Sequence, residues 1–434
     1  MPSLSFIYVF LPLSLFCYYA IPHKQRPLGL LLISLIYLLM VQPWMASFAA
    51  GLVLVDYIAI RAMKRYAVAR KLLLGFVLLK NLAMVVVSGL FFENGAMPLF
   101  LGAAVYAVSS TDAALTFYRE EDTDTNFANF GLFCLFFPRL YAGPVQPYRE
   151  FTPQLEQIHF NFKCLHLGFG QFVQGALKVV LIAGQCAGLV LTISEFPAGD
   201  VTVLSLWVLT LSFAFWLYFT LSGYSDMARG LGVMFGIFLP MNFYYPYQSH
   251  GVNDFTERFN STLSAFLKRN IGAPLVDKGA VPEILGLFWM GILFGLWFGP
   301  NVNYLLWGII LCLLMLAERR VIKLLSALIP TFFRRIFTLG IMLLSFALII
   351  GQSVHYGIEY MRGMLGFGNY TLYNEMIMYQ IASNLVLLIL AAFFSTSAVN
   401  RLTRLAQKTI PRVADAVSVL INAALLVVLT ASIL

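Results

Sequence analysis

Long apolar runs recur along this 434-residue chain, and they constrain its fold more than any other feature of the sequence. A helix needs about 17 to 25 predominantly apolar residues to cross the hydrocarbon core of a bilayer. Hydrophobic residues make up 60% of the chain and charged residues only 11%, whereas charged residues are about 25% of a soluble domain. We therefore predict an all-α polytopic membrane protein in which residues 1–434 form a single integral-membrane domain. Candidate spans start near positions 4, 28, 46, 72, 98, 168, 201, 284, 302, 335, 376 and 414.

One further apolar segment, Phe127 to Tyr141, is short and leads into a Gly-Pro break, which is typical of a re-entrant segment. With it, we expect about 11–13 transmembrane or re-entrant helices. The first apolar run, Ser5 to Ile21, lacks a basic flank and a small-residue cleavage site, so we interpret it as a retained helix rather than a signal peptide. The five cysteines show no CxxC spacing and indicate neither a metal site nor a disulfide framework.

Lys and Arg residues cluster in short connections between the apolar runs, which predicts that those connections lie on the cytoplasmic side. The connections Gln42 to Ser47 and Glu93 to Pro98 carry almost none, so both termini are predicted to lie outside. The net charge of +8 then indicates contact with anionic membrane lipids, and nucleic acid is not expected as a partner. The basic connections contain Lys24 and Arg26; Arg61, Lys64, Arg65, Arg70 and Lys71; Arg319, Arg320, Lys323, Arg334 and Arg335; and Arg401, Arg404, Lys408 and Arg412.

Two charged residues, Asp56 and Lys80, each lie within an apolar span. An isolated charge at that depth costs at least ~2.5 kcal/mol, so a pair between neighbouring helices is the natural solution. A proton or substrate path would also place charges there. We favour the buried structural pair, because neither residue belongs to a dense polar group.

A polar segment from Tyr224 to Asn270 interrupts the apolar pattern, with too many charges for a span and too much aromatic surface for an ordinary loop. Polar, glycine-broken backbone at membrane depth is tolerated only where protein buries it or where it lines a cavity. We therefore predict the functional site in this segment. Tyr224 to Asp226 are expected to end a span, and Leu239-Pro240 to stop the following helix. Asp254 is the predicted N-cap of an amphipathic helix from Phe255 to about Lys268.

Only one of the five histidines, His250, lies in this polar segment. Histidine is the side chain best suited to accept a proton from a hydroxyl near neutral pH. We interpret His250 as a loop residue at a helix-initiating turn, and a catalytic role is the alternative.

Three blocks of the sequence resemble the membrane-bound O-acyltransferase family, in its bacterial polysaccharide branch that contains the membrane subunit of alginate O-acetylation. The signature region, residues 222–308, includes GYSDMARGLGVMFGIFLPMNFYYPY followed by DFTERFNSTLSAFLKR, and GLWFGPNVNYLLWG (Gly295 to Gly308). FFPRLYAGPVQPYREFTPQL, from Phe136 to Leu155, resembles the Gly-Pro segment of the family. The stretch Tyr118-Arg119-Glu120 and the final third of the chain also fit, so the resemblance covers most of the sequence.

The resemblance implies a ring of tilted helices around a central tunnel that joins a cytoplasmic donor to an acceptor on the other side of the membrane. It also implies a multi-pass protein of the bacterial inner membrane that passes acetyl or another small acyl group to an extracytoplasmic polysaccharide or to a partner acyltransferase there. No bound cofactor is expected. The implied acyl donor is acetyl-CoA or an acyl-carrier thioester.

The sequence departs from the family at the two positions where the resemblance predicts histidines. The catalytic His position of the Gly-Leu-Trp-His-Gly motif is Phe298, and the second His position is Asn260. Phe cannot transfer a proton, and an Asn amide can orient a hydroxyl or a carbonyl but has no useful basicity. The expected catalytic positions are Phe298, Asn260, Asp226 and Tyr224, and the expected tunnel residues are Ser225, Arg258, Glu257, Trp297, Asn242 and His250.

Whether the chain is an enzyme therefore stays open at the level of the sequence. The first hypothesis is glycan O-acylation by other residues or with a partner. The second is a catalytically inactive family member that serves as a scaffold or as a conduit for acyl groups or lipid in an envelope-glycan assembly. A secondary transporter is less favoured, because no matching pair of broken helices appears in the two halves of the chain.

Overall fold

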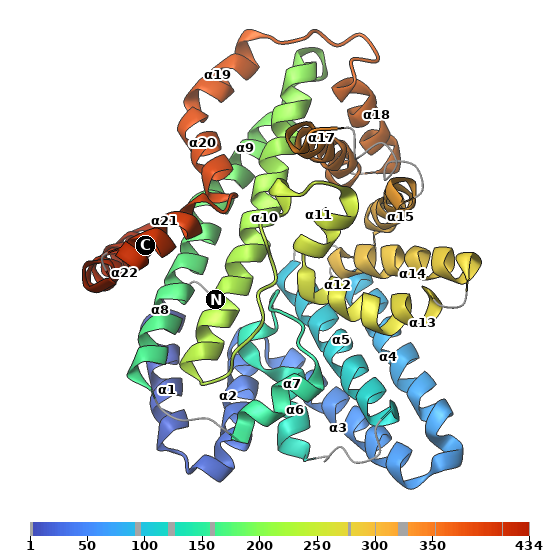
Figure 1. Cartoon of the computed structure of the whole chain (residues 1–434), viewed down its shortest axis with the longest axis vertical. Helices are drawn as coiled ribbons and strands as arrows, with labels where there is room; N and C mark the ends of the chain where they lie inside the picture. Colours follow the sequence, from blue (N-terminus) through green and yellow to red (C-terminus); the bar gives the residue numbers. More distant parts are fainter. Residues whose placement is uncertain are drawn as a thin grey trace. The chain divides into compact units, whose positions relative to one another are not determined.

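Helices form nearly all secondary structure in the computed structural model, which describes residues 3–91, 97–119, 126–156, 161–276, 279–299, 301–319, 329–351, 353–409 and 411–433 (Figure 1). Within these ranges the β contact is an isolated antiparallel bridge between Phe243 and Phe259. The predicted all-α class is confirmed. Glu93, Glu120, Arg320 and Lys323, used above, lie outside the described residues.

Six helical segments in the described ranges are long and apolar enough to cross a membrane, and two helices bent by 58° make a seventh if they form one span. The protein is thus a membrane protein. Four further apolar helices are shorter than 18 residues, so several of the predicted spans are shorter than a full crossing. The six are His23–Val41, Ala46–Arg65, Phe162–Ser194, Val203–Met234, Val281–Phe298 and Thr331–Ile350; the bent pair is Glu375–Ser383 with Leu385–Phe394; the shorter ones are Phe6–Ala20, Phe127–Arg139, Val302–Ala317 and Val419–Ile433.

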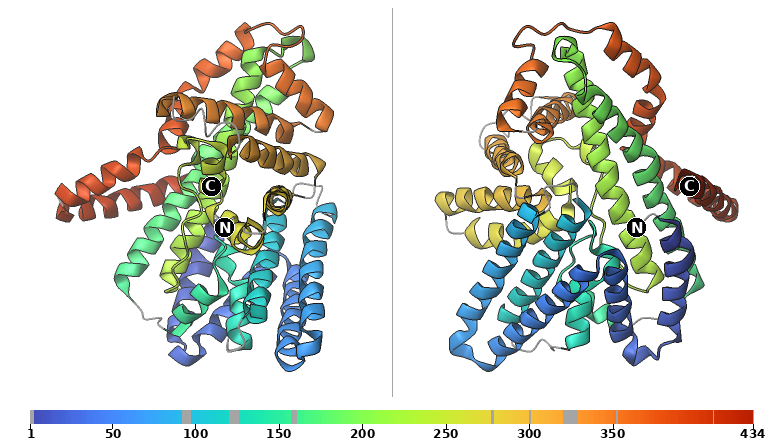
Figure 2. Two further views of the ribbon diagram at one scale, coloured as in Figure 1. Left: turned by 45° about the vertical axis from the view of Figure 1, so that its right-hand side comes forward. Right: turned by 180° about the vertical axis from the view of Figure 1, so that it is seen from behind.

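The chain divides into two compact units, of which the first consists mainly of Met1–Phe172 and Tyr224–Met241. Within it, α2 to α5 follow one another as neighbouring helices, and α6 packs against α2, α3 and α5 (Figure 2). Its helices are α1 (Leu11–Ala20), α2 (Arg26–Val41), α3 (Pro43–Arg65), α4 (Arg70–Phe91), α5 (Met97–Arg119), α6 (Phe127–Leu135), α7 (Tyr148–Phe151), most of α8 (Phe162–Leu177) and the end of α10 (Val203–Met234).

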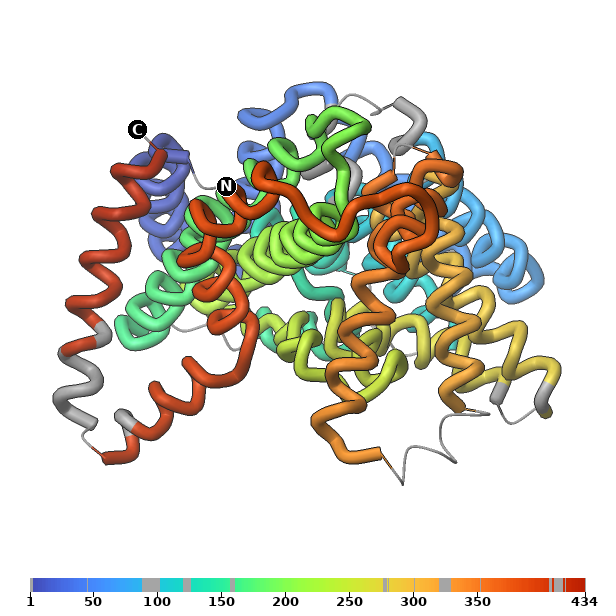
Figure 3. Tube along the Cα trace, turned by 90° about the horizontal axis from the view of Figure 1, so that it is seen from above, coloured from blue at the N-terminus to red at the C-terminus, as the bar shows by residue number. Residues whose placement is uncertain are grey.

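The second unit consists mainly of Val173–Gly223 and Asn242–Ser432. In it α14 packs against α15, α15 against α17, and α17 against α18 (Figure 3). The helices of the second unit, besides most of α10, are α9 (Gly184–Ser194), α11 (Val252–Arg258), α12 (Ser261–Leu267), α13 (Ala273–Val276), α14 (Ala280–Phe298), α15 (Val302–Ala317), α17 (Thr331–Ile350), α18 (Val354–Met364), α19 (Glu375–Ser383), α20 (Leu385–Phe394), α21 (Ala398–Thr409) and α22 (Pro411–Ile433). The single domain over residues 1–434 stays a prediction from the sequence.

Pairs of glycines allow helices within each unit to approach closely. A Cβ added to Gly168 of α8 would lie 2.5 Å from the carbonyl oxygen of Gly230 of α10. In the second unit, a Cβ added to Gly308 of α15 would lie 2.1 Å from the carbonyl oxygen of Gly291 of α14. Small residues drive helix association in lipid because they let backbones come into van der Waals contact.

The predicted pair between Asp56 and Lys80 is confirmed within the first unit. The Lys80 ammonium donates to Oδ2 of Asp56 at 2.8 Å, and the hydroxyls of Tyr106 and Ser110 donate to the same oxygen at 2.7 Å each. Asp56 is fully buried. The helices α3, α4 and α5 are therefore joined by one charged pair whose carboxylate is supported by hydroxyl donors, as a structural interaction requires.

Candidate functional site

Tyr224, Ser225 and Asp226 lie inside α10, which runs on to Met234. The expectation that they end a span is therefore wrong. The helix stops at Gly236, whose φ of +78° is a left-handed conformation that favours glycine. The break thus comes before Leu239-Pro240, because the amide of Ile237 already bonds back to the carbonyl of Gly232 at 2.8 Å.

These consecutive residues point in different directions from α10, since neighbouring positions on a helix are about 100° apart. The ring of Tyr224 stacks on that of Tyr141, with centroids 5.8 Å apart and an interplanar angle of 12°. Asp226 pairs with Arg229 at 3.4 Å, and both side chains are partly exposed. Ser225 is 2% exposed, and its hydroxyl makes no hydrogen bond within the described part of the chain. Tyr141, in the Gly-Pro segment, is a neighbour that sequence reasoning did not connect with Tyr224.

In the second unit, Asn242 joins the loop from Asn242 to Tyr247, which is rich in aromatic residues, to the start of α12. Its backbone carbonyl accepts from the amide of Ser261 at 2.8 Å, and its side-chain Oδ1 accepts from the amide and the hydroxyl of Thr262 at 3.2 and 2.7 Å. The amide of Tyr244 donates to the carbonyl of Arg258 at 3.0 Å. These bonds form the bridge between Phe243 and Phe259 and fix the backbone on both sides of Asn260.

Asn260 separates α11 from α12 with a left-handed backbone, φ 58° and ψ 55°. Asparagine is one of the few residues that adopt this conformation readily. The continuous helix predicted from Phe255 to Lys268 is therefore wrong. Asp254 is not the N-cap either: it lies in the first turn of α11, whose N-cap is Gly251.

The side chain of Asn260 is 2% exposed, and its Oδ1 has no hydrogen-bond partner among the described residues. An unpaired buried acceptor costs ~1–3 kcal/mol. Such an atom marks a position where a hydroxyl group from another molecule could donate. In the same predicted segment, Oδ1 of Asn270 is also buried without a hydrogen-bond partner among the described residues.

Phe298 ends α14 inside a cage of aromatic rings. Its ring centroid lies 5.4 Å from that of Trp307 and 5.7 Å from that of Phe294. The ring of Phe259, the residue before Asn260, is 6.2 Å away. Phe298 and Trp297 are each 4% exposed. The two positions at which the resemblance predicts histidines are therefore near each other in this unit, linked through Phe259.

A chain of polar contacts runs through His250. Arg335 donates to Nε2 of His250 at 3.0 and 3.3 Å, and Nδ1 of His250 lies 3.2 Å from Oδ2 of Asp254. Because a guanidinium can only donate, Nε2 must accept, so the neutral ring carries its proton on Nδ1 and donates it to Asp254. Arg258 donates to Oδ1 of Asp254 at 2.6 Å. Arg335 lies 85 residues from His250, so no local pattern could have connected them.

The environment of Asp254 changes its protonation. Burial by itself raises the pKa of this carboxyl, but the hydrogen bonds from Arg258 and His250 and the charge of Arg258 together lower it below its usual value. Asp254 therefore stays ionised and orients the imidazole. Asp254 belongs to α11, outside the segments that can span a membrane.

Glu257 lies on the surface beside this chain of contacts. It forms an ion pair with Lys268, and its side chain is 53% exposed. Arg258 turns the other way, toward Asp254 and the carbonyl of Tyr244. Within the described residues, no group of three or more His, Cys, Asp and Glu side chains could hold a metal ion.

Comparison with known proteins gives matches to the same family that the sequence motifs resemble. A model of MBOAT, the membrane-bound O-acyltransferase family, matches residues 28–358. A probable alginate O-acetylase AlgI of Pseudomonas fluorescens is 31% identical over 312 residues, covering 70% of this chain and 63% of that protein. A peptidoglycan O-acetyltransferase of Helicobacter pylori is 35% identical over 195 residues, covering 43% of this chain and 36% of that protein.

A more distant relative is the teichoic acid D-alanyltransferase of Bacillus subtilis, 25% identical over 196 residues, covering 42% of this chain and 49% of that protein. The chain thus spans less than two thirds of the length of each of these relatives.

Proposed function

Because this chain belongs to the membrane-bound O-acyltransferase family, we propose that it takes part in transferring acetyl or another small acyl group across the membrane to an extracytoplasmic polysaccharide. The family match over residues 28–358 is the observation that carries this proposal. The names of the relatives describe acyl transfer to alginate, peptidoglycan and teichoic acid, which are all envelope or extracellular polymers.

The proposed chemistry is acyl transfer from a thioester, acetyl-CoA or an acyl-carrier thioester, that reaches the protein from the cytoplasm. A hydroxyl oxygen of the acceptor, or of a partner acyltransferase outside, attacks the thioester carbonyl carbon. The carbon–sulfur bond breaks, the sulfur leaves as thiolate, and the hydroxyl proton passes to a base. A location in the bacterial inner membrane would give the protein access to the donor in the cytoplasm and to the acceptor outside it.

Asn260 suits the orienting part of this reaction. Its unpartnered Oδ1 can accept a hydrogen bond from the acceptor hydroxyl, and its amide N–H can donate to the thioester carbonyl. Phe298 can do neither, and the aromatic cage around it excludes water instead. Without a positioned base, the rate of such a step falls by about 10²- to 10⁴-fold.

We assign the base to His250. Asp254 holds its Nδ1–H and so leaves Nε2 as the proton acceptor, which is the arrangement of a base with its orienting carboxylate. In this structure the Arg335 guanidinium donates a hydrogen bond to Nε2. The Arg335 side chain is exposed, so it can move aside when a hydroxyl approaches. Asp226 and Tyr224, in the first unit, are the other candidates.

The test offers labelled acetyl-CoA and a labelled acyl-carrier thioester to the full chain in lipid nanodiscs, alone and with the products of neighbouring genes. We expect acyl transfer or donor hydrolysis in at least one arm. His250→Gln should lower that rate by about 10²-fold or more. The matched control is His355→Gln, an exposed histidine of α18, which should leave the rate unchanged.

Each outcome decides between the hypotheses. A complete lack of turnover in every arm would contradict the hypothesis that the protein is an enzyme and would favour the hypothesis of a scaffold or conduit. Turnover that His250→Gln does not change removes His250 as the base, and a loss in Asp226→Ala then assigns that role to Asp226.

A further inference from the structure

A pocket of about 340 Å³ lies in the second unit, and none of the predicted site residues lines it. Two segments that are far apart in the sequence line it: the loop before α10, and the second half of α18 with the loop that follows it. Its volume is at the lower end of the range for small-molecule sites, about 300–1,000 Å³. The lining residues are Ala198, Gly199, Val201, Glu359, Arg362, Phe367, Gly368, Asn369, Tyr370 and Thr371.

Hydrogen bonds between the two loops hold the pocket together. The amide of Val203 donates to the carbonyl of Thr371 at 3.0 Å, and the amide of Leu204 donates to that of Leu372 at 3.1 Å. The side-chain amide of Asn374 donates to the carbonyl of Asp200 at 2.9 Å. The pocket walls are therefore joined by two main-chain bonds and one bond from a side-chain amide.

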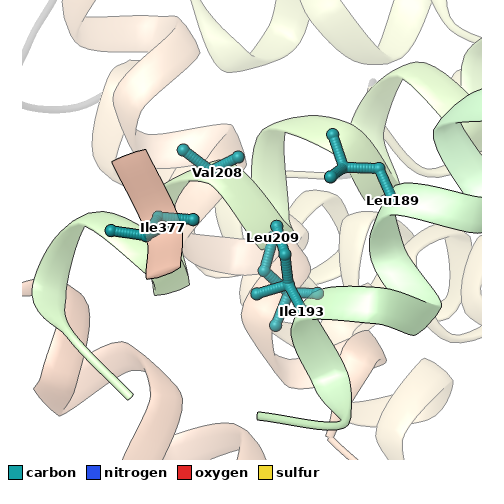
Figure 4. Packing of buried hydrophobic residues seen from close by; sticks show 5 residues of the cluster. All are labelled: Leu189, Ile193, Val208, Leu209 and Ile377. Carbon is teal, nitrogen blue, oxygen red and sulfur yellow. The ribbon is translucent and has the colours of Figure 1, made fainter. Parts of the chain in front are cut away.

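The helices that carry these loops pack tightly. Buried side chains from α9, α10 and α19 meet in one cluster, Leu189, Ile193, Val208, Leu209 and Ile377 (Figure 4). On the α18 side, Met364 packs with Leu206 and Ala347, and the indole N–H of Trp207 donates to the Met364 carbonyl at 2.8 Å. Such support makes the pocket preformed, which lowers the ordering cost of binding a ligand.

The lining combines hydrogen-bonding groups with aromatic surface. Arg362 and Glu359 pair at 3.1 Å and balance each other's charge, so the charged side chains of the lining add no net charge. Asn369, Tyr370 and Thr371 offer amide and hydroxyl groups. Phe367 is 62% exposed, on a turn where Gly366 and Gly368 have φ of +79° and +118°. A hydroxyl-rich ligand with apolar faces matches this lining better than an ion or a purely apolar ligand does.

We propose that this pocket binds a short saccharide segment of the acceptor polymer, and this assignment rests on the proposed function. The helix α17 begins near Arg334 and Arg335, in a connection predicted to be cytoplasmic, and is long enough to span the membrane. The pocket lies beyond its other end, where α18 follows. That end is the extracytoplasmic one, where an acceptor polysaccharide is found.

The binding test uses the full chain in nanodiscs without any acyl donor. The probes are a labelled oligouronate of the alginate type and a labelled N-acetylated amino-sugar oligosaccharide of the peptidoglycan type. We expect saturable binding of at least one probe. Phe367→Ala and Asn369→Ala should each weaken it by roughly 3- to 10-fold, and Tyr379→Ala, a control at an exposed aromatic outside the lining, should not.

Absence of saturable binding of both probes overturns the proposal, and so does binding that neither pocket variant weakens. If neither glycan binds but a partner acyltransferase does, and Phe367→Ala abolishes that, the pocket is a protein-docking site. Because no donor is present, the binding result is independent of the proposed acyl transfer. Glycan binding together with no transfer in the donor assay would support the glycan-binding pocket and contradict the proposed transferase activity.

Discussion

The aromatic ring of Phe259 lies 6.2 Å from the ring of Phe298, with the two planes tilted by 35°. Phe259 directly precedes Asn260, and Phe298 ends α14, so one ring contact joins the two positions where the resemblance predicts histidines. The amide oxygen at one position has no hydrogen-bond partner among the described residues, and the ring at the other position is enclosed by aromatic rings. Two positions far apart in the sequence therefore meet in one apolar, aromatic environment that contains this amide oxygen.

Phe298→His should lower the free energy of unfolding by ~1–3 kcal/mol, because an imidazole would be buried among aromatic rings without a hydrogen-bond partner. Its effect on acyl transfer should be an increase or no change. Thermal unfolding and the donor assay measure the two effects. A turnover per folded molecule below that of the wild type would contradict this, and Phe298→Leu controls for the change of size.

Replacements of Asn260 should separate backbone strain from chemistry. Asn260→Ala should destabilise the protein by ~1–2 kcal/mol, because alanine disfavours the left-handed conformation. Asn260→Gly should be tolerated, since glycine adopts that conformation readily. Both lack the amide, so both should lower acyl transfer about equally. A glycine variant with the wild-type rate would remove the orienting role from Asn260.

Asp254 should make the stability of the protein depend on pH in the acidic range. Its folded pKa lies below the unfolded value of about 3.9. The ionised form is therefore favoured by folding, and its contribution is complete above the unfolded pKa and is lost as the pH falls through the folded pKa. The unfolding difference between wild type and Asp254→Asn should be constant above about pH 5 and shrink below about pH 4.

Arg258→Gln is the matched partner variant for this titration. It removes the strongest hydrogen bond to Asp254, so the pH range over which stability is lost should move upward. A wild-type profile in Arg258→Gln would show that the ion pair does not control the ionisation of Asp254.

Breaking the buried pair of Lys80 and Asp56 should have a larger effect. Lys80→Met leaves an uncompensated buried carboxylate and should destabilise the protein by ~3–5 kcal/mol. The double variant Lys80→Met with Asp56→Asn should recover part of this loss, because an asparagine oxygen still accepts from Tyr106 and Ser110 without a charge. Equal unfolding midpoints in the single and double variants would contradict this explanation.

The local patterns of the sequence predicted correctly what depends on local physics. Apolar runs predict helices because a bilayer leaves no other way to satisfy the backbone, and Asp56 and Lys80 were expected to pair because a lone charge is costly at that depth. Short-range patterns failed at Asn260, where helical periodicity continues but a single left-handed residue breaks the helix. They also failed at Asp226, since α10 continues beyond it to Met234.

Sequence by itself determined that this protein is an all-helical membrane protein and what family it resembles, and it predicts that Phe298 and Asn260 stand at the two positions where the resemblance implies histidines. Only the tertiary structure decided that Arg335 meets His250, that Phe259 links Asn260 to Phe298, and that the loops around Gly199 and Asn369 enclose a pocket. The physical reason is the separation along the chain between the residues that interact. Hydropathy and residue identity are properties of each segment alone, whereas these contacts join segments distant in the chain, and only the packing of the helices brings them together.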